Sequence, residues 1–218
     1  EQQSSTDWAL LNSVILEDWN VKFVGLSQGS QTKEEQRFNE FGMTGCLNFY
    51  NSSFINVDLS VYSGECEDSL NIVKSTGNLA SIKIVNAFSD AVDIDFSNIS
   101  IDDLVVTNAG NDCFDASGGR YQISKSTLHK CDDKGISVGE SSYLTATEIN
   151  LTSANIGISS KDYSKVNVLR AKIEDVTVCV EAKQKKQEFG GASLLIEDLM
   201  CDGIVKVDRH SVFKAGLR

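Results

Sequence analysis

The chain has no proline among its 218 residues, where about 10 would be expected from an average usage of about 5%. Proline cannot donate to a β-ladder, so its absence favours a chain that is mostly paired strand. No apolar run approaches 18 residues, so no transmembrane helix is expected. No segment shows sustained helical periodicity, so helices are not expected among the main elements.

The sequence also lacks common catalytic signatures and an excess of positive charge. Gly-x-Ser-x-Gly, His-Glu-x-x-His, a phosphate-binding glycine loop, zinc-site spacing and an EF-hand loop do not occur. The 20 Lys and Arg residues are outnumbered by 31 Asp and Glu residues, which gives a net charge of -11. This charge argues against nucleic acid or an anionic membrane as the main partner. It is compatible with cations, or with a polyanion where basic residues are concentrated locally.

What the chain has is a repeat of about 22 residues. The apolar residues at the centres of short β-rich runs, here called the anchors, recur at one spacing of 23 and five spacings of 22. They are Leu47, Leu70, Val92, Phe114, Ile136, Ile158 and Val180, and Val205 follows after 25 residues. A mostly apolar residue stands two places after each anchor, as in a strand with one buried face. The pattern predicts an all-β fold, a parallel β-helix of eight or nine coils and about 40 Å long.

We expect one domain over residues 1–218. Residues 1–43 form an N-terminal coil and a polar loop, 44–207 form the regular coils, and 208–218 form a C-terminal tail. Trp8 to Gly25 is predicted to be the first coil, and Gln28 to Asn39 a projecting loop. Lys183 to Gly191 exceeds the coil length and predicts a second, basic loop.

Charged residues gather at outward positions of successive coils. Relative to the anchors, Asp90, Asp112 and Lys134 stand two places before, Asp93 and Asp115 one place after, and Asp95, Lys161 and Lys183 three places after. Equivalent positions of neighbouring coils lie above one another, so aspartates are predicted to cluster below lysines. Like charges this close disfavour joint ionisation, so the cluster must hold a proton, bind a cation or meet lysines.

Three chemistries fit this cluster. In a glycosidase, Asp90 and Asp112 would be acid and base, which requires carboxyls about 5 to 9.5 Å apart. In a uronate lyase or epimerase, a cation or lysine would neutralise the carboxylate, and Lys134 or another base would remove the C5 proton. In both, Asp93, Asp115, Lys161 and Lys183 would bind substrate. The third is a Ca²⁺ site on Asp93, Asp95 and Asp115, joined by Asp90 and Asp112. The alternative is structural: the aspartates cap backbone amides and Lys134 pairs with Asp112.

The six cysteines follow the same register. Cys46, Cys113 and Cys179 each stand one place before an anchor, and Cys66, Cys131 and Cys201 follow them after 20, 18 and 22 residues. The recurrence of cysteine pairs separated by about one coil predicts the disulfides Cys46–Cys66, Cys113–Cys131 and Cys179–Cys201. Buried free thiols are the alternative. Disulfides would indicate an extracellular, cell-surface or periplasmic location.

Three segments resemble the polygalacturonases of the pectin lyase-like superfamily, which are right-handed parallel β-helices. These are Ser89-Asp90-Ala91-Val92-Asp93-Ile94, Gly110-Asn111-Asp112-Cys113-Phe114 and Asp133-Lys134-Gly135-Ile136-Ser137. Asn111-Asp112 replaces the family's paired aspartates, Lys134 replaces its histidine, and Lys161 falls near its Arg-x-Lys position. The chain is also similar to extracellular β-helix domains that accompany CotH-type bacterial surface proteins, through Thr44-Gly45-Cys46, Cys66-Glu67-Asp68, Ser160-Lys161-Asp162 and Gln184 to Gly190.

Together these observations predict a secreted or cell-surface right-handed β-helix that binds or modifies an acidic extracellular polysaccharide, as a hydrolase or as a lyase or epimerase. Other domains of a larger surface protein are expected as partners, and neither nucleic acid nor membrane insertion is expected. The alternatives are a structural or adhesive β-helix module and a trimeric tailspike-like glycan-binding protein.

Overall fold

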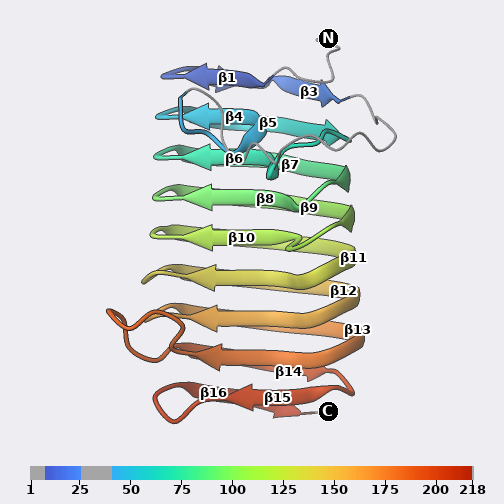
Figure 1. Cartoon of the computed structure of the whole chain (residues 1–218), viewed down its shortest axis with the longest axis vertical. Coiled ribbons are helices and arrows are strands. Elements are labelled where there is room, and N and C mark those ends of the chain that lie inside the picture. Colours follow the sequence, from blue (N-terminus) through green and yellow to red (C-terminus); the bar gives the residue numbers. More distant parts are fainter. Residues whose placement is uncertain (1–7, 26–40, 218) are drawn as a thin grey trace.

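The computed structural model describes residues 8–25 and 41–217. In these residues 16 strands form one continuous parallel sheet, which winds into a β-solenoid of about eight turns (Figure 1). The described residues contain no helix, and so none that could span a membrane. The all-β parallel β-helix and its spacing of about 22 residues are therefore confirmed.

The strands are β1 (Ala9–Asn12), β2 (Ile15–Glu17), β3 (Asn20–Val24), β4 (Gly45–Tyr50), β5 (Ser53–Tyr62), β6 (Asp68–Val73), β7 (Thr76–Ala87), β8 (Asp90–Asp95), β9 (Asn98–Ala109), β10 (Phe114–Ser117), β11 (Arg120–Gly139), β12 (Tyr143–Lys161), β13 (Lys165–Lys183), β14 (Ser193–Met200), β15 (Ile204–Val207) and β16 (Val212–Leu217).

The anchors lie in one column of strands, here called the anchor stack. It consists of β1, β4, β6, β8, β10, the C-terminal ends of β11, β12 and β13, and β15 (Figure 1). Its register is the predicted one: Leu70 pairs with Val92, and Val180 pairs with Val205 across the longer step. The remaining strands form a second stack, and the coil interior between the stacks is filled by buried apolar side chains.

Buried serines illustrate how this fold satisfies polar groups at its turns. The Ser52 amide donates to Ser75 Oγ at 3.0 Å, and the Ser75 amide donates to Ser97 Oγ at 2.9 Å. Further along the chain, Ser142 Oγ accepts from the Gly119 amide at 3.4 Å. Each hydroxyl therefore accepts an amide from the preceding coil. A column of polar residues in this protein can thus be a purely structural ladder.

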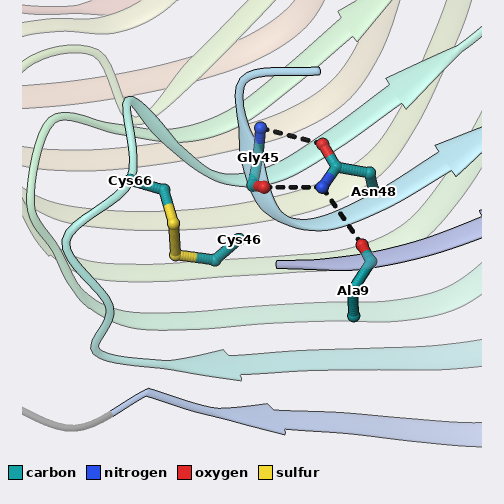
Figure 2. Close-up of a disulfide and its surroundings, with 5 residues drawn as sticks. All are labelled: Ala9, Gly45, Cys46, Asn48 and Cys66. Carbon is teal, nitrogen blue, oxygen red and sulfur yellow. Dashed lines mark hydrogen bonds between the residues drawn. A yellow bond between two sulfur atoms is a disulfide. The ribbon is translucent and has the colours of Figure 1, made fainter. Parts of the chain in front are cut away.

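The three predicted disulfides are present. They join Cys46 to Cys66, Cys113 to Cys131 and Cys179 to Cys201, and each ties neighbouring coils. In Figure 2 the first of them lies beside Asn48, whose amide side chain bonds to Gly45 and to the Ala9 carbonyl. Three disulfides indicate an oxidising compartment, outside the cell or in the periplasm.

The ends differ in part from expectation. Trp8 to Gly25 contains β1, β2 and β3, so it forms the expected first coil, whereas the predicted loop Gln28 to Asn39 lies outside the described residues. The segment assigned to a C-terminal tail contains β16, which pairs in parallel with β14. No anchor marks this segment, because residues 212–217 belong to the second stack.

Candidate functional site

Asp90, Asp112 and Lys134 form a column that we call the aspartate ladder. Asp90 Oδ1 accepts the Asp112 amide at 2.8 Å, and Asp112 Oδ1 accepts the Lys134 amide at 3.0 Å. The Lys134 ammonium lies 3.3 Å from Asp112 Oδ1 and also pairs with Asp133. Asp90 and Asp112 therefore each accept a backbone amide of the coil that follows, whereas the buried serines accept an amide of the coil before. These contacts explain the positions of all three side chains without a bound substrate.

Asp112 nevertheless has an unusual protonation equilibrium. Burial raises its pKa to about 7, because loss of solvation outweighs the attraction of Lys134. Burial also raises the pKa of Asp90, although the amide of Asp112 opposes the shift. Asp68, one coil below Asp90, has its pKa raised to about 8 by burial, against the effect of a hydrogen bond from Thr44.

Asp93, Asp95 and Asp115 form a second group, here called the acidic row. Asp93 and Asp115 are paired positions of β8 and β10, and Asp95 lies two residues beyond Asp93 on the same outer face. Asn71 donates to Asp93 Oδ2 at 3.1 Å. Asp115 Oδ1 is buried and accepts no hydrogen bond. Unlike the ladder, the acidic row is thus incompletely satisfied.

Burial and the charges of neighbouring carboxyls raise the pKa values of Asp93 and Asp95. Burial, followed by the charges of Asp68, Asp95 and Asp115, raises the pKa of Asp93 well above its usual value. Burial, with Asp115 and Glu140, raises the pKa of Asp95 to about 6, and Lys186 opposes this shift. Asp95 therefore changes its charge in the mildly acidic range, where a carboxyl can act as a general acid.

The lysines above the row are already engaged. Lys161 is 6% exposed and its ammonium donates to Ser137 Oγ at 2.7 Å. Its stem lies over Gly139, where an added Cβ would be in ordinary contact with Lys161 Cε at 3.5 Å. Lys183 pairs with Glu181 at 2.8 Å. The two lysines predicted to bind substrate carboxylates are therefore held by protein groups in this conformation.

The basic loop after β13 folds back along the stack instead of projecting freely. Asp162 accepts the amides of Lys185 and Lys186 at 2.6 and 2.8 Å, and the Lys186 ammonium pairs with Glu140. Lys186 and Glu140 both act on the pKa of Asp95, so this ion pair lies near the acidic row. The repeat showed that the loop is longer than a coil allows. It could not show that Asp162 and Glu140 hold the loop, because these contacts do not recur from coil to coil.

The predicted Ca²⁺ site has no preformed ligand set. Among the described residues, no group of three or more His, Cys, Asp or Glu side chains is placed to hold a metal ion. Asp93, Asp95 and Asp115 share a face but do not form such a group.

Sequence reasoning missed two cavities. A polar groove of about 790 Å³ crosses several coils beside the turns at Asn108, Lys130, Ser153 and Asp175. A smaller cavity of about 240 Å³ lies at the turns that follow the anchor stack, next to Phe96 and Tyr143. Turn residues carry no hydrophobic period, so neither cavity could be read from the repeat.

Comparison with protein-family models, with curated proteins and with solved structures finds no match. The resemblances to polygalacturonases and to CotH-associated domains therefore stay predictions.

The raised carboxyl pKa values predict that stability falls as pH rises. Asp68, Asp95 and Asp112 bind protons more tightly in the native than in the unfolded protein, so the free energy of unfolding decreases between about pH 5 and pH 8. Although burial opposes it, Lys134 lowers the pKa of Asp133, and that contribution is lost only at lower pH. Urea unfolding across this range measures the slope. A free energy of unfolding that rises towards pH 8 would contradict the assignment.

Proposed function

We propose that this protein is an extracellular β-helix that binds a polysaccharide over the acidic row and hydrolyses it. The observation that carries the proposal is incomplete satisfaction: Asp115 Oδ1 is buried without a partner, whereas the aspartate ladder beside it is paired. Burying an unpaired carboxylate oxygen is unfavourable. Groups kept at such a cost, beside carboxyls of raised pKa, are characteristic of functional sites.

The chemistry assigns separate roles to two carboxyls. Asp95, with a pKa of about 6, donates a proton to the glycosidic oxygen that leaves. The half-buried carboxyl of Asp115 receives, on the oxygen other than the buried Oδ1, a proton from the water that attacks the sugar carbon. Asp95 and Asp115 stand one coil and two residues apart, about 8 Å between Cα atoms by strand geometry. Side chains on one face of neighbouring coils can bring their carboxyls to the separation of about 6.5–9.5 Å that an inverting glycosidase needs for the water between them.

The other aspartates support this pair. The protonated carboxyl of Asp93 lies between Asp95 and Asp68 without adding a full negative charge. The aspartate ladder fixes the neighbouring coils. Asp90 and Asp112 are therefore scaffold residues in this proposal, and the acid and base roles belong to the acidic row.

A polysaccharide screen tests the proposal. The disulfide-bonded protein is incubated with uronate-containing, sulfated and neutral polymers, and new reducing ends are measured. Release of unsaturated ends, detected by ultraviolet absorbance, would instead indicate a lyase. If no polymer gains ends of either kind, the hydrolytic proposal fails.

A second candidate is a structural or adhesive module without catalysis. The observation that favours it is the mutual satisfaction of Asp90, Asp112 and Lys134, which needs no ligand. A glycan array separates the candidates when combined with the polymer screen. Binding without cleavage favours adhesion, and the absence of both favours a structural role.

A further inference from the structure

The smaller cavity begins immediately after Asp95 and spans three successive coils. It has a volume of about 240 Å³ and lies where β8, β10 and β11 turn into the strands that follow them. Its lining includes Phe96, Asn98, Gly118, Arg120, Ser141 and Tyr143. Pockets for drug-sized ligands hold about 300–1,000 Å³, so this one suits a single ring-sized unit.

Phe96 forms one wall of the cavity, and its side chain is 58% exposed. Its φ is +50°, and Asn51 and Lys74 adopt the same conformation at the equivalent turns of the two preceding coils, so the turn itself sets this backbone. What distinguishes Phe96 is its side chain, because the two preceding turns carry polar residues. Gly118 makes room for the ring, since a Cβ there would lie 2.5 Å from Phe96 Cδ1. An exposed aromatic ring beside a cavity is suited to binding a ligand.

Arg120 supplies a positive charge at the edge of the cavity. It pairs in register with Asn98 on one side and Tyr143 on the other, and its guanidinium lies 5.9 Å from the centre of the Tyr143 ring. The Tyr143 hydroxyl is held by Asn167 at 2.9 Å. Within the described residues Arg120 forms no ion pair, although the chain carries a net charge of -11.

We propose that this cavity binds one uronate unit of a polysaccharide. The sugar ring packs against Phe96, the guanidinium of Arg120 binds the carboxylate through two parallel hydrogen bonds, and Asn98 and Ser141 bond to hydroxyls. The inference rests on the proposed function, because it takes the ligand to be the polymer that passes over Asp95. It assigns carboxylate recognition to Arg120, since Lys161 and Lys183 are held by Ser137 and Glu181.

Calorimetric titration with a galacturonate tetramer and a neutral galactose tetramer tests the assignment. We expect the uronate to bind and the neutral tetramer to bind at least about tenfold more weakly, because a charge-assisted contact is lost. Arg120→Gln should weaken uronate binding by a similar factor. Arg170→Gln, an exposed arginine paired with Glu148, is the matched control and should bind as the wild type does. Equal affinity for both tetramers, or for both variants, would overturn the assignment.

Phe96→Asn separates a binding role from a structural one. Asparagine tolerates positive φ, so the variant should unfold at the same or a higher temperature while its uronate affinity falls. Phe88→Asn is the matched control, since Phe88 is 59% exposed and lies outside the cavity. Lower stability with unchanged affinity would mean that Phe96 serves packing and would contradict the proposal.

Asp95→Asn distinguishes failure of this inference from failure of the proposed function. The variant should bind the uronate tetramer as the wild type does and should no longer cleave polymer. If cleavage survives but Arg120→Gln still abolishes binding, the cavity stands and the catalytic assignment falls. If Asp95→Asn abolishes cleavage but neither Arg120→Gln nor Phe96→Asn changes binding, the cavity assignment is wrong and the catalytic role of Asp95 is retained.

Discussion

Asp95→Asn is expected to lower the rate of polysaccharide cleavage by about 10²- to 10⁴-fold, the usual contribution of a general acid. Asparagine keeps the shape of the side chain but cannot donate the proton that Asp95, with a pKa of about 6, carries in mildly acidic solution. The fold should be retained, because the substitution removes a buried charge that its neighbours repel. Initial rates of reducing-end release on the polymer identified by screening measure the effect.

The matched control is Asp102→Asn, an exposed aspartate in β9. It should cleave at the wild-type rate. The pH profile adds a second readout, since the limb that reports the general acid should disappear only in Asp95→Asn. Wild-type cleavage by Asp95→Asn would remove the acid role from this residue.

Val105→Pro is expected to prevent folding. Val105 lies inside β9, in register with Lys83 of the coil before and Thr127 of the coil after. Proline removes the amide donor, and leaving a ladder carbonyl unpaired costs about 1–3 kcal/mol. Its ring also collides with a neighbouring coil, so the pairing on both sides is disturbed. We expect the variant to be insoluble or to show no cooperative urea transition.

Val105→Thr keeps the amide donor and the branched shape, and it should unfold close to the wild-type midpoint. This control separates loss of the ladder from loss of the side chain. A soluble Val105→Pro variant with a wild-type midpoint would show that the ladder tolerates proline, and the explanation of the proline-free sequence would be wrong.

Much of the fold could be predicted because the solenoid repeats one register. Anchors such as Leu70 and Val92 recur at coil spacing, and the structure pairs them directly. The cysteines follow the same register, so their pairing could be derived from position alone. Periodicity thus determines which residues share a column.

The state of the outward side chains could not be predicted from that periodicity. Ser137 stands at an outward position but is fully buried, because Lys161 lies along the sheet and covers it. The direction of a long side chain depends on what lies beneath it, here Gly139. The sequence likewise placed Asp90, Asp112, Asp93 and Asp115 in one cluster. It could not distinguish the paired ladder from the incompletely satisfied acidic row.

That distinction is the central claim, and the urea midpoints of Asp112→Ala and Asp115→Ala test it directly without any substrate. Asp112→Ala should lower stability by about 1–3 kcal/mol, because the Lys134 amide loses its acceptor. Asp115→Ala should lower stability less or raise it, because it removes a buried oxygen without a partner and a charge that raises the pKa values of Asp93 and Asp95. If Asp115→Ala is the more destabilising of the two, the acidic row is structural and the account is wrong.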